Sequence, residues 1–547
     1  MDFQRLFLSL IFGFSLFLLW DSWERSQHSP LPQQAGGAAS AVAAAGASAV
    51  VAGPQQETAA GGGQLPGSPE AAKSGKKVLV KTDILLAEIS TVGGTLQKLE
   101  LLQHRATDSD KPYALLQKRE AHTYLAQSGL LGDGLPTHNA EFTTADDNVQ
   151  LAEGKDSVQV RLQATTAGGV KVTKVYTFHR GSYLIDVGYE IENGGKTAVA
   201  PEVYYLLVRD STNPVGDSKF VPTYTGPGVY TNEAKFEKVS FSDIDKKKAK
   251  FPADATNGWV GMLQHYFVAA WLPKAGLEHA NVIDTPDGKL YRAGIRYKMA
   301  AIEPGKNEST SVTLYAGPAQ SKLDAIAPGL GLTVDYGLLT PIAKPLFIGL
   351  SYIHGWVGNW GVAIIILTIL IKLVFFPLSA ASYRSMAKMR VVAPKLEKIK
   401  AQYADDRERL HKAMMELYKT EKINPLGGCL PMLIQIPVFI SLYWAILSSV
   451  ELRHAPFVGW ITDLSSPDPY YVLPLIMGAS MLLQSKLNPT PPDPLQAKVM
   501  QAMPIIFSVV FFFFPAGLVL YSVVNNALSI LQQWVITRNA EKDKKPA

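Results

Sequence analysis

The sequence has little that could carry catalysis or bind a metal. It contains one cysteine, Cys429, which excludes an intramolecular disulfide and a cysteine-rich zinc or iron–sulfur site. The patterns HExxH and GxSxG are both absent. Gly195-Lys196-Thr197 resembles the end of a phosphate-binding loop, but Glu190 stands where that loop needs its first glycine. We therefore expect no enzymatic activity, no metal and no cofactor.

Charge is also scarce. Charged residues make up 18% of the 547 residues, below the usual share of about 25%. A protein that faces water over its whole surface is therefore doubtful. The net charge is only +5, so nucleic-acid binding needs a local basic patch. The length allows several domains, and the composition changes sharply along the chain.

The N-terminal region combines an apolar run with a low-complexity segment. Leu6–Trp20 is apolar and follows a short head that carries Arg5. A signal peptide is the alternative, but no small-residue cleavage site follows the run closely. We therefore expect a transmembrane anchor over residues 1–22. Residues 23–77, rich in Ala, Gly and Pro, have no periodic apolar face and are predicted to be a flexible linker.

Residues 78–335 show the pattern of half-buried strands. Val158, Val160 and Leu162 alternate with polar residues, and the same period of two recurs from Tyr183 to Ile191. No apolar run in this region is long enough to span a membrane. We expect one large antiparallel β-sandwich that lies in water.

Residues 343–547 are predicted to form an apolar helical core. Spanning helices are expected at about 358–376, 430–447, 470–484, 499–514 and 516–535. A helical hairpin over 378–425 carries eleven Lys/Arg against six Asp/Glu, which places it and the C-terminus in the cytoplasm. The predicted fold is therefore a multi-domain membrane protein with six transmembrane α-helices. These are one N-terminal anchor plus a five-helix core, and both termini are cytoplasmic. They carry a large antiparallel β-sandwich on the outer side of the membrane, which in a bacterium is the periplasm, or the exterior where there is no second membrane.

Lys372 is the most informative residue of this core, because a lysine in a spanning helix costs about 2.5–3.5 kcal/mol at mid-depth. Thr368 lies one turn earlier on the same face, and Gln435 lies in another predicted span. The last span carries a polar stripe at helical spacing: Ser522, Asn525, Asn526, Ser529 and Gln533. Three interpretations remain open: a shared hydrophilic groove, hydrogen bonds that hold helices together, or a lysine that reaches the headgroups.

The hairpin 378–425 has amphipathic helices with a basic face. Its apolar positions recur every three or four residues, as in Met386 and Met389. A hairpin that merely connects spans is one interpretation; the other is a docking surface for anionic lipid, ribosomal RNA or a targeting factor. The residues expected to dock are Met386, Lys388, Met389, Arg390, Lys395 and Lys412.

Five motifs of the C-terminal region resemble the Oxa/YidC/Alb family of membrane protein insertases, in the same order and spacing. They are SMAKMR (385–390), NPLGGCLP (424–431), SVELR (449–453), DPYYVL (468–473) and PAGLVLY (515–521). The anchor, linker and β domain resemble the Gram-negative branch. The resemblance implies a groove open to the cytoplasm and lipid and closed on the periplasmic side. Its cation is an arginine in the family, whereas this chain has Lys372, which lacks the planar fork of a guanidinium.

The resemblance further implies groove roles for Thr368, Gln435, Ser522 and Asn525. It implies a bacterial inner-membrane location and an insertase that acts alone or with the Sec translocon. The expected partners are nascent membrane proteins, the Sec translocon, the ribosome or signal recognition system, and membrane lipid. A secondary transporter and a non-inserting structural assembly factor are the alternatives. No internal repeat of the kind common in transporters is visible among the five C-terminal spans.

Overall fold

The computed structural model describes residues 65–66, 75–107, 109–119, 122–214, 223–403, 406–421, 430–487 and 494–542. The predicted anchor, most of the predicted linker and most of the NPLGGCLP motif, with Cys429, lie outside these residues. The chain divides into two compact units, Met1–Thr333 and Val334–Ala547.

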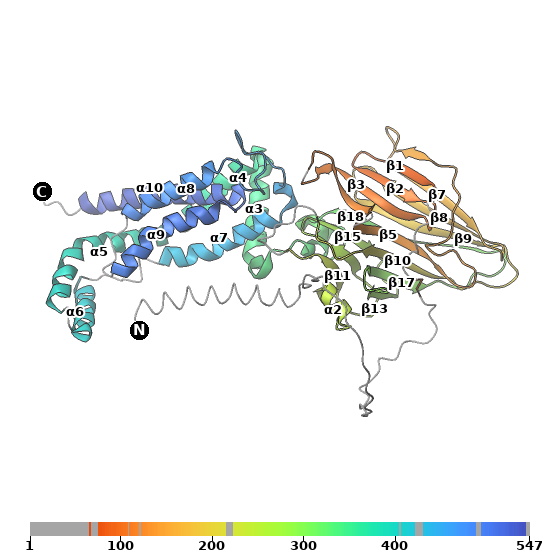
Figure 1. The fold of residues 1–547 in the computed structure, drawn as a ribbon, viewed down its shortest axis with the longest axis horizontal. Coiled ribbons are helices and arrows are strands. Elements are labelled where there is room, and N and C mark those ends of the chain that lie inside the picture. Colours follow the sequence, from red (N-terminus) through yellow and green to blue (C-terminus); the bar gives the residue numbers. More distant parts are fainter. Residues whose placement is uncertain are drawn as a thin grey trace, which may run out of the picture. The chain divides into compact units, whose positions relative to one another are not determined.

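The first unit contains a ten-stranded sheet and an eight-stranded sheet (Figure 1). The larger sheet has the order β13 (Asp254–Ala255), β16 (His279–Asp284), β17 (Tyr291–Lys298), β10 (Glu202–Arg209), β5 (His122–Leu131), β4 (Pro112–Arg119), β3 (Thr95–Arg105), β2 (Leu85–Ser90), β1 (Lys77–Lys81) and β6 (Asn148–Gln150). The smaller sheet has the order β12 (Lys235–Lys238), β11 (Gly226–Thr231), β14 (Trp259–Leu263), β15 (Phe267–Leu272), β18 (Asn307–Pro318), β9 (Leu184–Asn193), β8 (Val170–His179) and β7 (Ser157–Thr165). Neighbouring strands are antiparallel, except that β1 and β6 run parallel.

The two sheets pack face to face because each presents alternate apolar side chains to the other. Val160 and Leu162 of β7 are fully buried, as the alternation predicts. Tyr205 of β10 and Trp271 of β15 belong to different sheets, and their ring centroids lie 5.1 Å apart. The predicted antiparallel β-sandwich is thus confirmed. The described part of this unit also contains the short helices α2 (Phe241–Asp245), η1 (Ser321–Ala325) and η2 (Leu330–Thr333).

The second unit is helical. It consists of η3 (Gly337–Leu339), α3 (Thr340–Val357), α4 (Trp360–Val374), α5 (Phe376–Gln402), α6 (Arg407–Thr420), α7 (Leu430–Ser448), η5 (Val450–Leu452), α8 (Val472–Leu487), α9 (Pro494–Phe511) and α10 (Ala516–Lys542). Helix α10 packs against α4, α5 and α8, while α3 packs against α4 and α7 (Figure 1). Asn359 caps α4, and its side-chain oxygen accepts a hydrogen bond from the Val362 amide.

A sharp bend separates α4 from α5. The two helices meet at Phe375 at 66°, and Pro377 lies in the first turn of α5, where a proline is tolerated. Within the residues described, this bent pair, Trp360–Val374 with Phe376–Met389, has the length and composition for a membrane span, and no single helix does.

Candidate functional site

Lys372 lies near the C-terminal end of α4 and is 8% exposed. Its Nζ donates a hydrogen bond to Oγ of Ser529 on α10, 2.7 Å away. Ser529 Oγ in turn donates to the carbonyl oxygen of Asn525, at 2.8 Å. In the part of the chain that the structure describes, Ser529 is the one hydrogen-bond partner of Lys372, and no carboxylate pairs with it. An ammonium group has three donors, so two of them have no protein acceptor there.

The polar stripe of α10 serves two neighbouring helices. Ser529 faces α4 through Lys372. Asn526 and Gln533 instead face α8: Asn526 Nδ2 donates to Ser480 Oγ at 2.8 Å, and Gln533 Nε2 donates to the Leu487 carbonyl at 3.1 Å. For these two residues the structure shows the interhelical hydrogen bonds that the sequence left as an alternative.

The other predicted groove residues lie around the same helix pair. Thr368 and Ser522 are buried and donate to carbonyls of their own helices, at 2.7 and 2.9 Å. Gln435 Nε2 donates to the hydroxyl of Tyr521, which joins α7 to α10. Asn525 Oδ1 is buried and has no hydrogen-bond partner among the residues that the structure describes. The structure therefore links Lys372 to Asn525 through Ser529, and among the described atoms no two of the five predicted residues are directly hydrogen-bonded to each other.

One end of the helical unit is covered by the segment Ser449–Tyr471. Its Phe457 carbonyl accepts from Asn359 at the start of α4, and its Leu464 carbonyl accepts from Gly517 at the start of α10. Gly361 is required here, because a Cβ would lie 2.0 Å from the Phe457 ring. Lys372 lies twelve residues beyond the first residue of α4, or about 18 Å along a helix, from this covered end.

Asp468 organises the covering segment, a role that the sequence did not reveal. Its buried carboxylate accepts from Trp460 Nε1 and from the amides of Tyr470 and Leu473, at 2.8–3.0 Å. It thereby satisfies amides at the start of α8. The signal available in the sequence was an Asp-Pro pair shortly before an apolar run, which is typical of a helix start.

The docking residues predicted on the hairpin differ in exposure. Lys388 of α5 and Lys412 of α6 are exposed, and Met386 and Met389 are partly buried. Lys395 is exposed too, but its Nζ lies 2.6 Å from the carboxylate of Glu421, just after α6. Arg390 is on α5, and its side chain lies outside the described atoms. The hairpin thus presents Lys388 and Lys412 to solvent, whereas Lys395 ties the C-terminal half of α5 to the end of α6.

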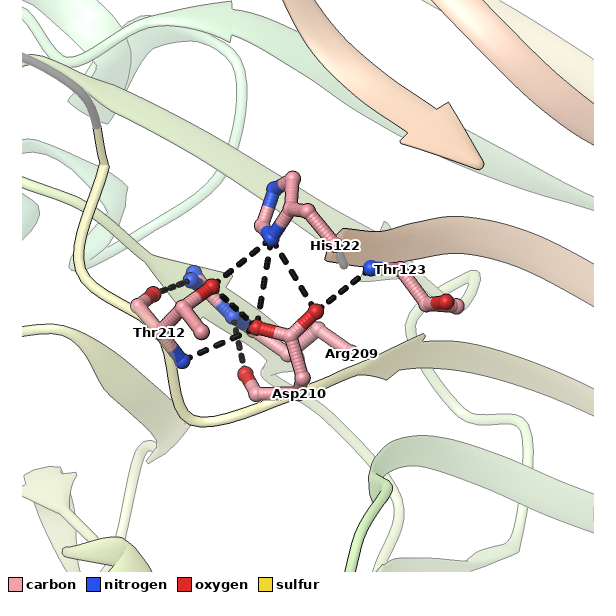
Figure 2. Close-up of polar contacts among 5 residues, drawn as sticks. All are labelled: His122, Thr123, Arg209, Asp210 and Thr212. Carbon is pink, nitrogen blue, oxygen red and sulfur yellow. Dashed lines mark hydrogen bonds and ion pairs between the residues drawn. The ribbon is translucent and has the colours of Figure 1, made fainter. Parts of the chain in front are cut away.

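The β unit has a polar cluster of its own at the start of β5 and the end of β10. Figure 2 shows His122, Thr123 and Thr212 around the carboxylate of Asp210. The Thr123 amide donates to Asp210 at 2.5 Å, and His122 Nδ1 lies 3.0 Å from the same oxygen. Burial alone would raise the pKa of Asp210, but the hydrogen bonds from His122, Thr212 and Thr123 outweigh it and hold that pKa below its usual range. Because its oxygens are taken up by these donors, the carboxylate ties two strands together and is a poor candidate for a metal or substrate ligand.

Comparison with known proteins covers the whole chain. Residues 77–348 match the family model of the YidC periplasmic domain, and residues 352–544 match that of the 60Kd inner membrane protein. The membrane protein insertase YidC of Nitrosospira multiformis is 54% identical, with 99% of this chain and 98% of the relative covered. That of Aromatoleum aromaticum is 53% identical, with 100% of both covered. A crystal structure of an active YidC insertase aligns with a TM-score of 0.39 at 18% identity, covering 84% of this chain and 92% of that one.

Proposed function

The chain belongs to the YidC family of membrane protein insertases, and from that premise we propose that Lys372 is the group with which it attracts client segments. The protein is an insertase of the inner membrane, its substrates are membrane proteins, and its β-sandwich is periplasmic. The observation that supports the role of Lys372 is its burial beside a single hydroxyl, with no carboxylate partner in the described chain. A buried cation without an anionic partner is costly in an apolar helix, and this cost supports a functional role for the position.

The proposed mechanism follows from the cost of moving polar residues through about 30 Å of hydrocarbon. Lys372 attracts acidic residues of the client segment that must cross. Thr368, Gln435, Ser522 and Asn525 form the walls of a hydrophilic groove and replace part of the lost hydration; the partnerless oxygen of Asn525 supports this role. The apolar part of the client then leaves sideways into lipid, driven by hydrophobic transfer.

The proposed topology has six spanning helices: the anchor at 1–22 and five helices of the core at 343–547, with the linker at 23–77 between the anchor and the β domain at 78–335. The basic hairpin 378–425 supports a cytoplasmic location for that segment and for both termini. The groove is then closed on the periplasmic side by Ser449–Tyr471 and open on the side of the hairpin.

We also propose that the hairpin receives clients from the ribosome or signal recognition system, with lipid headgroups as a further contact, and that the core can act beside the Sec translocon. The exposed Lys388 and Lys412 support the docking role, because anionic surfaces attract unpaired surface cations most strongly. Lys395 contributes less, since Glu421 already neutralises it.

Site-specific crosslinking tests the groove. A photoreactive residue at position 525 or at position 372 should crosslink to ribosome-bound nascent membrane proteins. The matched control is position 475, because Leu475 is an exposed residue of α8. Crosslinks from 475 but from neither groove position would contradict the proposal and favour a non-inserting assembly factor.

Replacement of hairpin charges tests docking. The double variant Lys388→Glu/Lys412→Glu should lose most ribosome co-sedimentation at low salt and retain normal membrane integration. The control Lys395→Gln removes one positive charge from the same hairpin and should change binding little. Equal loss in both variants would show that only the net charge of the hairpin matters.

A further inference from the structure

Leu65 and Pro66 belong to the region that the composition predicts to be a uniformly flexible linker, yet both contact the β-sandwich. Leu65 packs against an apolar cluster on the ten-stranded sheet. The members of the cluster, on β5, β10 and β16, are Leu125, Leu131, Tyr204, Leu206, Val208 and Val282. The contact therefore shields part of an aliphatic side chain from water at a defined place.

A hydrogen bond fixes the next residue of the segment. Arg292 of β17 is nearly buried, and its Nε and Nη2 donate to the carboxylate of Asp284 on β16, each at 2.6 Å. Its Nη1 donates to the Pro66 carbonyl at 3.0 Å. The guanidinium is thus held in place by a bidentate pair and presents its remaining edge to the linker.

We propose that this face of the ten-stranded sheet is a docking site for an extended peptide segment in which a branched aliphatic residue is followed by a carbonyl acceptor, and that the protein's own Leu65-Pro66 is its resident ligand. The apolar cluster recognises the side chain, and Arg292 recognises the backbone. Proline suits the second position because it has no amide hydrogen to satisfy and restricts the leucine before it to an extended conformation.

Docking changes what the linker does. The tether between the predicted anchor and the β domain ends at residue 64 and does not run on to the first strand. The predicted linker before the docked pair has 42 residues, 23–64, and a Gly-rich random coil of that length has a root-mean-square reach of roughly 35 Å. The β domain is therefore held by a fixed point on its own surface, and a sequence of low complexity contains one specific contact.

Limited proteolysis of the full chain in detergent tests the docking. Trypsin cleavage after Lys73 is followed, because that bond lies eight residues from Leu65 and is unchanged by substitution there. Leu65→Ser should raise the cleavage rate by several-fold to about tenfold, because Leu65 is partly buried and contributes part of the free energy of a fully buried leucine. Arg292→Lys, which keeps the charge beside Asp284 but cannot reach all three acceptors, should raise it several-fold. Leu65→Ile, which keeps a branched aliphatic side chain, should keep cleavage slow.

The matched control is Leu31→Ser, a linker leucine far from the docked pair, which should leave the rate unchanged. Cleavage inside the strands, for example after Lys171 of β8, monitors unfolding of the β domain and should stay slow in all variants. A rate at Lys73 that is the same in the wild type, Leu65→Ser and Arg292→Lys would overturn the proposal. An equal rise in Leu31→Ser would overturn it as well, because the effect would then come from linker composition.

Discussion

Each unit of the protein buries one lysine that has no carboxylate partner in the described chain, and the two lysines are surrounded differently. Lys174 of β8 is fully buried. Its Nζ donates to the carbonyls of Gly93 and Ser128, at 2.9 and 3.2 Å, and lies 5.4 and 5.6 Å from the ring centroids of Tyr176 and Tyr189. Burial lowers the pKa of Lys174 well below its usual value.

Among the residues that the structure describes, Lys372 has one hydroxyl partner and lies over no aromatic ring. Lys174 joins β8 to β5 of the other sheet and to the turn before β3, so its donors are used within the fold. Lys372 joins α4 to α10 by one bond, and two of its three donors have no acceptor among the described residues, as the proposed client-binding role requires. Burial of a lysine therefore does not by itself mark a functional site. We distinguish a structural lysine, whose donors are used by acceptors of the protein, from an available lysine, which has donors left for a client.

The largest effect should come from removing the structural lysine. Lys174→Ala leaves two buried carbonyls with fewer donors and a cavity where the stem lay, so we expect the β domain to lose about 2–5 kcal/mol of unfolding free energy. Pulse proteolysis of the full chain in urea measures this loss. Lys174→Met keeps an unbranched side chain in place of the lysine stem, so its unfolding free energy should lie between those of the wild type and Lys174→Ala. If Lys174→Met were more stable than the wild type, the amino group of Lys174 would not contribute to the stability of the β domain.

Removing the available lysine should affect clients and leave stability unchanged. Lys372→Ala should reduce insertion of membrane proteins with acidic translocated segments on the order of tenfold, equivalent to about 1.4 kcal/mol, and reduce neutral clients less. Lys372→Glu should reverse the preference toward basic segments, and Lys372→Arg should keep it. The control is Lys486→Ala, an exposed lysine of α8. Insertion assays with matched acidic and neutral clients measure the ratio; equal losses for both would indicate a folding defect.

The sequence contains enough to place both lysines but not to tell their roles apart. Lys372 stands out because it interrupts an apolar run. The period-two alternation of a strand could have predicted that Lys174 is buried, since Val172, Lys174 and Tyr176 share the core-facing side of β8. Their acceptors come from residues distant in sequence: Gly93 and Ser128 for one, Ser529 for the other. Such contacts depend on the tertiary arrangement, which local patterns do not specify.

The same limit explains the other differences. Helical spacing predicts one polar stripe on α10, but neighbouring helices on different sides divide it between α4 and α8. Composition predicts that the whole linker is flexible, because the single leucine Leu65 in a Gly-rich segment gives no periodic signal. The surface that Leu65 contacts is built from the three strands β5, β10 and β16, which are distant from it in sequence. Alternation predicts the sandwich, but it cannot predict that β10 lies between β5 and β17.

The lowered pKa of Lys174 gives a pH test of the comparison. The folded state binds this proton less tightly than the unfolded chain, whose lysine titrates near 10.4. The unfolded state therefore holds more protons between the two pKa values, and stability rises with pH in that window, by up to about 1.4 kcal/mol per pH unit. The difference in unfolding free energy between the wild type and Lys174→Met should shift in favour of the wild type from pH 7 to pH 9. A difference that does not change with pH would show that Lys174 keeps its proton on folding.

The smallest effects should come from single bonds of α10, and they separate helix packing from client selection. Asn526→Ala removes the bond to Ser480, and Ser529→Ala removes the bond to Lys372. Each should cost about 0.6 kcal/mol, the average for an interhelical hydrogen bond in a membrane. Only Ser529→Ala leaves Lys372 without a protein acceptor, so only this variant should change the ratio of acidic to neutral clients inserted, by a few-fold toward acidic ones. If both variants change the ratio of acidic to neutral clients equally, client selection depends on the packing of α10 and not on the hydroxyl that binds Lys372. The distinction between Lys174 and Lys372 would then rest on burial alone.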